Sequence, residues 1–305
     1  MLLGLLSAFI LTFVFTYLFK DKLPRDGGRA FAHDGAKSAG KARGAGIIFA
    51  IVYAVCSVIF YDITYEYTFY AILVILCMLT GFFDDASETP WSELRKGLLD
   101  LFIAVCVTAV YIYNNGTMIS LSPINVSFEL PVWLFAILST ILIWTSINVT
   151  NCADGVDGLS ATLSIITLLG IFFCMQKLNM AAGFAPHILV FIACLLAYLY
   201  FNTTPSILMM GDAGSRAMGL FIAIAILLTG CPFLYIPLAL VLALDGGLGL
   251  LKISLIRIAK IYILKDVRTP LHDHVRKNMG WSNTQCVYRF SMIQLILSVI
   301  VYYLL

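Results

Sequence analysis

Four groups of polar residues in this sequence interrupt or end apolar runs, and each could take part in chemistry. The first is the pair Asp84-Asp85, which ends an apolar run. Two adjacent carboxylates at a helix end can hold a divalent cation, or can divide into a base and its supporting partner. A solvated helix end would explain such a pair equally well, so this group alone is weak evidence.

The second group, residues 148–159, is much stronger. It places Asn148, Asn151, Asp154 and Asp157 between two apolar runs, and a glycine follows each of the two Asp residues. Capping a helix requires only one such side chain. Four carboxamides and carboxylates therefore indicate a ligand site, since their oxygens suit a hard cation or a nucleobase.

The third group is the turn at residues 209–219, which Asn202 precedes. It begins at Met209 and contains Asp212 followed by Gly214 and Ser215. A glycine-rich turn at a helix start offers free backbone N–H groups to phosphate oxygens. Asp212 could hold a Mg²⁺ ion that bridges those oxygens.

The fourth group is the loop segment 270–277, in which His272 and His274 flank Asp273 and basic residues lie close by. The two histidines could ligate zinc, but zinc would need further ligands and no cysteine is near. Hydrogen-bond donors to a diphosphate suit the positive surroundings better. Lys41, in a glycine-rich basic loop, is a further candidate for contacting an anionic substrate. The basic residues of this loop could equally serve only to keep it on the cytoplasmic side of the membrane.

The elements that must position these groups are membrane helices. The chain has 305 residues, of which 61% are hydrophobic and 12% charged, and its mean hydropathy is +0.96. Its apolar runs are each near or above the roughly 17–20 residues that cross a bilayer. We expect an all-α polytopic membrane protein of about ten transmembrane helices, formed by a single domain over residues 1–305. The expected runs are 1–19, 45–61, 68–83, 98–113, 131–147, 159–175, 185–201, 217–244 and 290–305, with a long or broken helix in 233–264.

The basic residues predict the orientation. If the runs cross alternately, eighteen of the nineteen Lys and Arg residues fall on one side and only Lys177 falls on the other. Cytoplasmic loops carry the excess of Lys and Arg, so we expect the four groups at the cytoplasmic face and the N-terminus outside. The net charge of +2 therefore gives no indication of nucleic acid as a partner. The partner implied by the composition is the lipid bilayer.

Taken in order, the four groups resemble the polyprenyl-phosphate N-acetylhexosamine-1-phosphate transferase superfamily. Its phospho-N-acetylmuramoyl-pentapeptide transferase branch is the most similar, through residues 26–29 with 40–47, through 148–159, and through 270–274 with Gly280-Trp281 and Arg289-Phe290. Three departures stand within these motifs, one of which is an extra residue in the loop before Gly280. Asp273 replaces the middle histidine of a triple, and Met209 stands where the branch has an aromatic residue that can stack on uracil.

The resemblance implies a reaction in the bacterial cell membrane. Phospho-MurNAc-pentapeptide would pass from its UDP derivative to undecaprenyl phosphate, which gives lipid I and UMP. It also implies Mg²⁺ as cofactor and suggests a homodimer. By resemblance, Asp212 and Asn151 bind the metal, and Asp84 with Asp85 acts on the lipid phosphate. Asp157, Asn202 and Asp154 bind the nucleoside, with Met209 at the position that stacks on uracil, and Asn148 is a further substrate-binding residue. Lys96, His272, His274 and Lys41 bind the diphosphate.

Two other functions remain open at this point. A GlcNAc-1-phosphate transferase for teichoic acid or O-antigen would use the same metal and carboxylates, and Lys252 resembles a basic residue of that branch. An ion-coupled transporter is a remote alternative. Transporters place acids near the bilayer centre and often contain inverted repeats, whereas these acids crowd helix ends and no repeat is visible.

Overall fold

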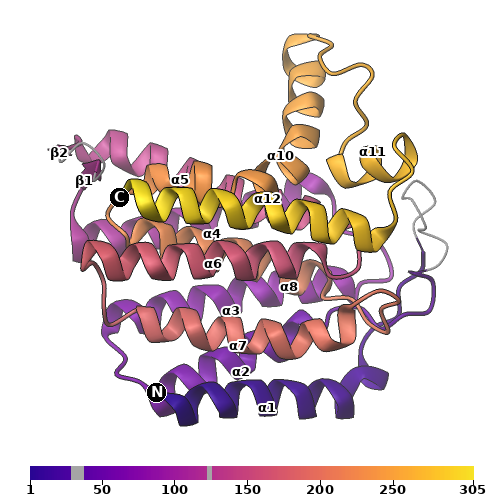
Figure 1. The fold of residues 1–305 in the computed structure, drawn as a ribbon, viewed down its shortest axis with the longest axis horizontal. Coiled ribbons are helices and arrows are strands. Elements are labelled where there is room, and N and C mark those ends of the chain that lie inside the picture. Colours follow the sequence, from indigo (N-terminus) through magenta and orange to yellow (C-terminus); the bar gives the residue numbers. More distant parts are fainter. Residues whose placement is uncertain (29–37, 122–125) are drawn as a thin grey trace.

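The computed structural model describes residues 1–28, 38–121 and 126–305, and the described chain is mostly helical (Figure 1). Figure 1 shows long helices lying side by side, with the connecting loops gathered at the two ends of the molecule. The helices are α1 (Leu2–Phe19), α2 (Gly46–Phe60), α3 (Tyr65–Asp85), α4 (Glu93–Asn115), α5 (Val132–Cys152), α6 (Leu159–Leu178), α7 (Ala185–Asn202), α8 (Gly211–Leu227), α9 (Tyr235–Leu238), α10 (Leu240–Ser254), α11 (Leu271–Lys277) and α12 (Asn283–Leu304).

The helices form two layers around α8. In the front layer of Figure 1, α1, α7, α6 and α12 lie side by side in that order, and each neighbouring pair is in contact. Behind this layer, α8 packs against α2, α3 and α5. Every residue of α8 is buried. A helix that is apolar on nearly all sides belongs inside a bundle, so α8 is the core element, and its first turn carries Asp212.

Seven of the described helices are long and apolar enough to cross a membrane, and the bent pair of α9 and α10 would make an eighth. The expectation of a polytopic and mostly helical membrane protein is therefore confirmed, although the described chain also contains one β-hairpin. Not all of the ten expected spans are long enough to cross a membrane. The number ten is reached only when the two shorter helices, α2 with 15 residues and α8 with 17, are added. Both start at the same end of the bundle, beside the predicted site.

The run 217–244, expected to be one span, is divided. Helix α8 ends at Leu227, Gly230 follows with a φ of +69°, and Pro232 begins a short 3₁₀ turn. Glycine adopts positive φ without a steric cost and proline cannot continue a helix, so the local sequence causes this break. The expectation of a long or broken helix over 233–264 is confirmed in its broken form, because the two halves are bent by 90°.

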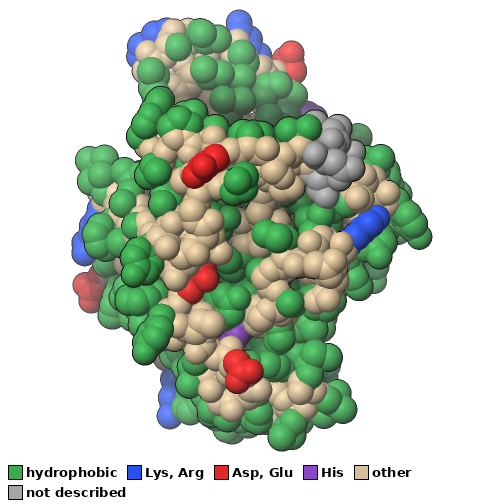
Figure 2. All heavy atoms as spheres, turned by 90° about the vertical axis from the view of Figure 1, so that its left-hand side faces the viewer, with side chains coloured by type: hydrophobic (Ala, Val, Ile, Leu, Met, Phe, Trp, Pro, Cys, Tyr) green, Lys and Arg blue, Asp and Glu red, His purple; other side chains and the backbone are tan. Residues whose placement is uncertain are grey.

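The two ends of the molecule differ. The loops that follow α1, α3, α5 and α7 meet at one end together with α11, on the right in Figure 1. The other end carries the hairpin of β1 (Met118–Leu121) and β2 (Val126–Glu129), which pair antiparallel. Figure 2 faces this second end, where hydrophobic side chains predominate, acidic groups are isolated and basic groups lie mainly at the outline of the molecule.

Candidate active site

The Asp84-Asp85 pair ends α3, and its two carboxylates have different surroundings. Asp85 accepts hydrogen bonds from the backbone N–H groups of Asp212 (3.2 Å) and Ala213 (3.1 Å). These N–H groups belong to the first turn of α8, where helical N–H groups have no partner inside the helix. Asp85 therefore fixes the start of α8 against the end of α3, and with it the position of Asp212.

Asp84 faces the neighbouring helix α4. Its Oδ1 accepts a hydrogen bond from the backbone N–H of Trp91 (2.7 Å), and its Oδ2 lies 2.8 Å from Nζ of Lys96. The same Nζ atom lies 3.4 Å from Oδ2 of Asp212. Lys96 thus stands between two carboxylates from different helices, and its side chain is only 16% exposed.

Arg43, from the loop before α2, completes the charge arrangement. Its guanidinium lies 2.8 Å from Asp85, 3.1 Å from Asp212 and 3.6 Å from Asp26. Burial lowers the pKa of Arg43, but the carboxylates of Asp85, Asp212 and Asp26 outweigh it, and the pKa lies above its usual value. We refer to Arg43, Asp84, Asp85, Lys96 and Asp212 as the Asp212 cluster.

The Arg43 loop is held against α8 by close backbone contacts. The N–H groups of Ala45 and Gly46 donate to the carbonyls of Met209 and Met210, and Met209 N–H donates to Ala42. A Cβ atom on Gly46 would overlap the backbone of Gly214 in α8. Glycine at position 46 therefore allows the close approach that brings Arg43 to Asp212.

Asn151, predicted as a metal ligand, lies beside Asp212. Its Nδ2 donates to Oδ2 of Asp212 at 3.5 Å, and its Oδ1 accepts a hydrogen bond from the Ser215 hydroxyl at 2.8 Å. Asn148 lies one helical turn deeper, where it contacts Asp100 (3.4 Å). Asp100 forms a buried ion pair with Arg216, so the Asn148 side chain faces this inner pair.

A second polar group lies between the loops after α5 and α7. Asp157 accepts hydrogen bonds from the hydroxyl (2.8 Å) and the backbone N–H (3.1 Å) of Ser206. Nζ of Lys41 lies 3.6 Å from Asp157 and donates to the Ser206 hydroxyl at 3.0 Å. Asn202 joins the same loops, because it accepts from Gly158 N–H and donates to the Leu208 carbonyl. Asp154 is partly buried in the same turn.

The histidine segment forms α11 and packs against α10. The carboxylate of Asp245 accepts the backbone N–H of His272 at 2.7 Å and lies 2.8 Å from its Nδ1 atom. The opposite ring atom, Nε2, faces Gly155, since a Cβ atom there would overlap it. His272 therefore bridges from α10 to the turn that carries Asp154 and Asp157.

The other two residues of this segment make different contacts. Nδ1 of His274 accepts the backbone N–H of Arg268 at 3.2 Å. Asp273 forms an ion pair with Arg276 at 2.7 Å, and Arg276 also donates to the Gly155 carbonyl at 3.4 Å. Asp273, which replaces the middle histidine, thus orients Arg276, and Arg276 contacts the turn at Gly155.

The structure brings most of the predicted residues to one end of the bundle, where they form three adjoining groups. Within the described residues, three or more His, Cys, Asp and Glu side chains nowhere gather as a ready-made metal site. Sequence reasoning missed Arg43, Ser206 and Asp245. Asp245 carried a signal, because it is an acid directly after an apolar run. Arg29, part of the similar amino-terminal motif, lies outside the described residues.

Comparison with known proteins identifies the family of this chain. The family model of glycosyl transferase family 4 matches residues 67–230. The chain is 37% identical to a phospho-N-acetylmuramoyl-pentapeptide transferase of Treponema pallidum, over 91% of this chain and 81% of the relative. It is 26% identical to a protein of the same name from Dictyoglomus turgidum, over 97% of this chain and 95% of that relative. The similarity therefore includes all three polar groups.

Proposed function

This chain belongs to glycosyl transferase family 4 and, within it, to the phospho-N-acetylmuramoyl-pentapeptide transferases, and we propose that the Asp212 cluster is its site of phosphoryl transfer. The enzyme transfers phospho-MurNAc-pentapeptide from its UDP derivative to undecaprenyl phosphate, which gives lipid I and UMP for peptidoglycan synthesis. It is a multi-pass protein of the bacterial cytoplasmic membrane. We treat the whole chain as one catalytic membrane domain.

One observation carries the assignment of the site. Three carboxylates from two helices converge with Arg43 and Lys96, although charged groups at helix ends are ordinarily free to spread into water. Both substrates carry phosphate, and phosphoryl transfer requires little covalent chemistry from the protein. Positioning and charge neutralisation are therefore the main tasks, and the Asp212 cluster supplies fixed positive groups beside fixed negative ones.

In the proposed reaction, an oxygen of undecaprenyl phosphate attacks the β-phosphorus of the nucleotide. The bond from that phosphorus to the bridging oxygen breaks, and UMP leaves with the electron pair. Asp84 orients the lipid phosphate or accepts its proton, and Lys96 holds Asp84 from 2.8 Å. Asp85 is a positioning residue, because both its oxygens contact the first turn of α8.

The donor set beside Asp212 fits Mg²⁺. This ion is usually held by one or two carboxylates together with substrate phosphates and water, and does not require a cage made only of protein groups. Asp212 offers its carboxylate oxygens, and the amide of Asn151 lies beside them, with Nδ2 3.5 Å from Asp212 Oδ2. The oxygen of the same amide, which accepts the Ser215 hydroxyl here, would complete a partial oxygen set if the amide turned toward the ion. When bound there, Mg²⁺ would neutralise charge on the diphosphate. Lys96 and Arg43 already approach the same carboxylate, which indicates that this position attracts cations.

The nucleoside end of the substrate is assigned to the Asp157 group. Asp157 is held by Ser206 and Lys41, and a carboxylate in a fixed position can accept the N–H group of uracil. Asn202 positions the two loops around it, and Asp154 lines the same turn. Met209 offers an apolar contact to the base in place of an aromatic ring. Nε2 of His272 and the ring of His274 are assigned to the diphosphate and the sugar side.

We also propose the orientation and the assembly. The end that carries the Asp212 cluster faces the cytoplasm and the N-terminus lies outside, which is supported by the eighteen-to-one distribution of Lys and Arg. A homodimer, which the family resemblance implies, belongs to the same proposal.

Substitution of Asp212 tests the assignment of the site. Purified wild type and Asp212→Ala are incubated with Mg²⁺, undecaprenyl phosphate and UDP-MurNAc-pentapeptide, and UMP release is measured. We expect the variant to lose turnover while it keeps its thermal midpoint in detergent, and we expect EDTA to abolish wild-type turnover. Activity of the folded variant near the wild-type level, or full activity in EDTA, would remove Asp212 from the site.

A further inference from the structure

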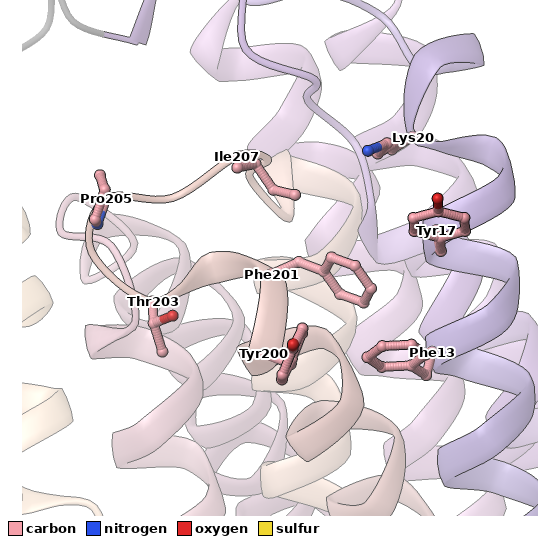
Figure 3. A pocket seen from close by; sticks show the side chains of 8 residues that line it. All are labelled: Phe13, Tyr17, Lys20, Tyr200, Phe201, Thr203, Pro205 and Ile207. Atoms are coloured by element: carbon pink, nitrogen blue, oxygen red, sulfur yellow. The ribbon is translucent and has the colours of Figure 1, made fainter.

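A cavity of about 420 Å³ lies between α1 and α7, apart from the Asp212 cluster (Figure 3). Its volume is in the roughly 300–1,000 Å³ range of small-molecule sites. The lining is mainly aromatic and aliphatic, and it ends at a single cation. The lining residues are Phe13, Tyr17 and Lys20 from α1 and its end, and Tyr200, Phe201, Thr203, Pro205 and Ile207 from α7 and the loop after it.

The lining residues are arranged by polarity along the cavity. In Figure 3, Phe13, Tyr200 and Phe201 gather at the deep part, whereas the Lys20 amine points toward the cavity from the end of α1. The rings of Phe13 and Phe201 are 4.9 Å apart, and Tyr200 packs against Phe13 at 5.1 Å. The Lys20 amine lies 5.1 Å from the ring centre of Tyr17. Aromatic rings below a lysine are typical of the level where lipid tails meet headgroups.

We infer that this cavity binds one chain of an anionic phospholipid, with the lipid phosphate paired to Lys20. An apolar chain fits the aromatic lining, since burial of its methylene groups is favourable. A lysine at the membrane surface attracts anionic headgroups. Lys20 has no carboxylate partner among the ion pairs of the described residues, so its charge is available to a lipid phosphate.

The bound chain would also support the loop that holds Asp157. Pro205 and Ile207 line the cavity, and Ser206 between them donates two hydrogen bonds to Asp157. A lipid chain against Pro205 and Ile207 therefore restricts the loop from the membrane side. This consequence rests on the proposed function, in which Asp157 contacts the nucleotide, and it predicts a lower KM for the nucleotide when the cavity is occupied.

Native mass spectrometry of the purified full chain tests the lipid site without any requirement for turnover. Wild type, Lys20→Gln and Lys22→Gln are purified from one kind of membrane, and the phosphatidylglycerol molecules retained per chain are counted. Lys22 is the matched control, because it lies two residues away and does not line the cavity. We expect Lys20→Gln to retain about fivefold less phosphatidylglycerol, the change for loss of one lysine charge near a membrane surface, and Lys22→Gln to match wild type.

A second variant and a second readout complete the test. Thr203→Trp places a ring in the cavity and leaves Lys20 in place, and we expect it to lose the lipid as well. In nanodiscs of phosphatidylglycerol, wild type should have a several-fold lower KM for UDP-MurNAc-pentapeptide than in phosphatidylcholine, and Lys20→Gln should lose this difference. An inactive wild type would count against the proposed function alone, because lipid retention is measured separately.

Three results would overturn the lipid site, and a fourth would overturn its link to the Asp157 loop. Equal loss of lipid in Lys20→Gln and Lys22→Gln would indicate general surface charge. Retention of undecaprenyl phosphate in place of phosphatidylglycerol would make the cavity part of the acceptor site. If the wild type were a dimer without bound lipid, and Lys20→Gln were a monomer, a second copy of the chain would cover the cavity. Loss of lipid with an unchanged KM would separate the cavity from the Asp157 loop.

Discussion

The carboxylate of Asp245 holds His272 at two points, the backbone N–H at 2.7 Å and the Nδ1 atom at 2.8 Å. Both residues are buried, and they join α10 to α11. A carboxylate that accepts a hydrogen bond from one ring nitrogen of a histidine fixes the orientation of the ring. It also determines whether the other ring nitrogen carries a proton. Here the other nitrogen faces Gly155, in the turn between Asn151 and Asp157.

We expect Asp245→Asn to lower kcat/KM by about 10-fold to 100-fold, the usual effect of losing such a supporting group. The neutral amide of Asn has only one acceptor oxygen, so it cannot accept both the ring N–H and the backbone N–H of His272 as the carboxylate does. Steady-state UMP release at several nucleotide concentrations would measure the change. Asp266→Asn, on an exposed loop acid, is the control and should match wild type. A folded Asp245→Asn enzyme with unchanged kcat/KM would show that His272 is positioned by other groups.

The sequence predicted the helices and the polar groups because both are local signals. Apolar runs longer than a bilayer crossing are visible without knowledge of packing, and the groups around Asp84, Asp154 and Asp212 interrupt them. The break after α8 was also signalled, by Gly230 and Pro232, but the long apolar run 217–244 obscured it.

The partners of these residues could not be predicted in the same way. Arg43 is 169 positions from Asp212 in the chain, and Lys41 is 165 positions from Ser206. Such contacts depend on how the loops meet at the end of the bundle, which local periodicity does not specify. For the same reason, the sequence indicated a general basic loop at residues 26–46, but not which of its cations reaches the carboxylates.

Arg43 provides the next prediction, because it contacts three carboxylates at once. Arg43→Gln should lower kcat by about 100-fold or more, as expected when a fixed positive group at a phosphoryl-transfer site is removed. Arg43→Lys should recover part of the rate, since an ammonium keeps the charge but cannot bridge Asp85, Asp212 and Asp26 with a planar fork.

Arg25→Gln is the matched control for Arg43, because its guanidinium lies at an exposed position and pairs with Asp21. It should retain the wild-type rate, and the thermal midpoint of each variant in detergent should be recorded beside the kinetics. If Arg43→Gln and Arg25→Gln lost activity equally, the basic loop would act through its overall charge, and the specific contacts of Arg43 would not matter.

The orientation predicts which residues are labelled from outside the cell. In a chain without its eight native cysteines, Glu88→Cys and Lys277→Cys lie at the end that carries the Asp212 cluster, and Asn114→Cys lies at the opposite end. A membrane-impermeant maleimide should label Asn114→Cys in intact cells, and should label the other two only after permeabilisation. The reverse pattern would place the site outside.

The choice of sugar nucleotide concerns the segment from α11 to the start of α12. This segment carries His272 and Arg276, which contact the turn at Gly155, and Asp273, which pairs with Arg276. In the proposed function, the sugar projects from the diphosphate on this side. Polar groups that bind the lactyl-peptide arm would be left without partners by a smaller nucleotide. A site built for hydrogen bonds rejects a substrate that lacks them by a factor on the order of 10⁴.

The kcat/KM of the purified enzyme for UDP-MurNAc-pentapeptide and for UDP-GlcNAc, with undecaprenyl phosphate and Mg²⁺ present, tests the proposed function most directly. Release of UMP is followed, and the lipid product is identified by mass. We predict that the MurNAc-pentapeptide nucleotide gives lipid I with a kcat/KM about 10⁴ times higher. Comparable values for the two nucleotides, or turnover of UDP-GlcNAc alone, would contradict the assignment.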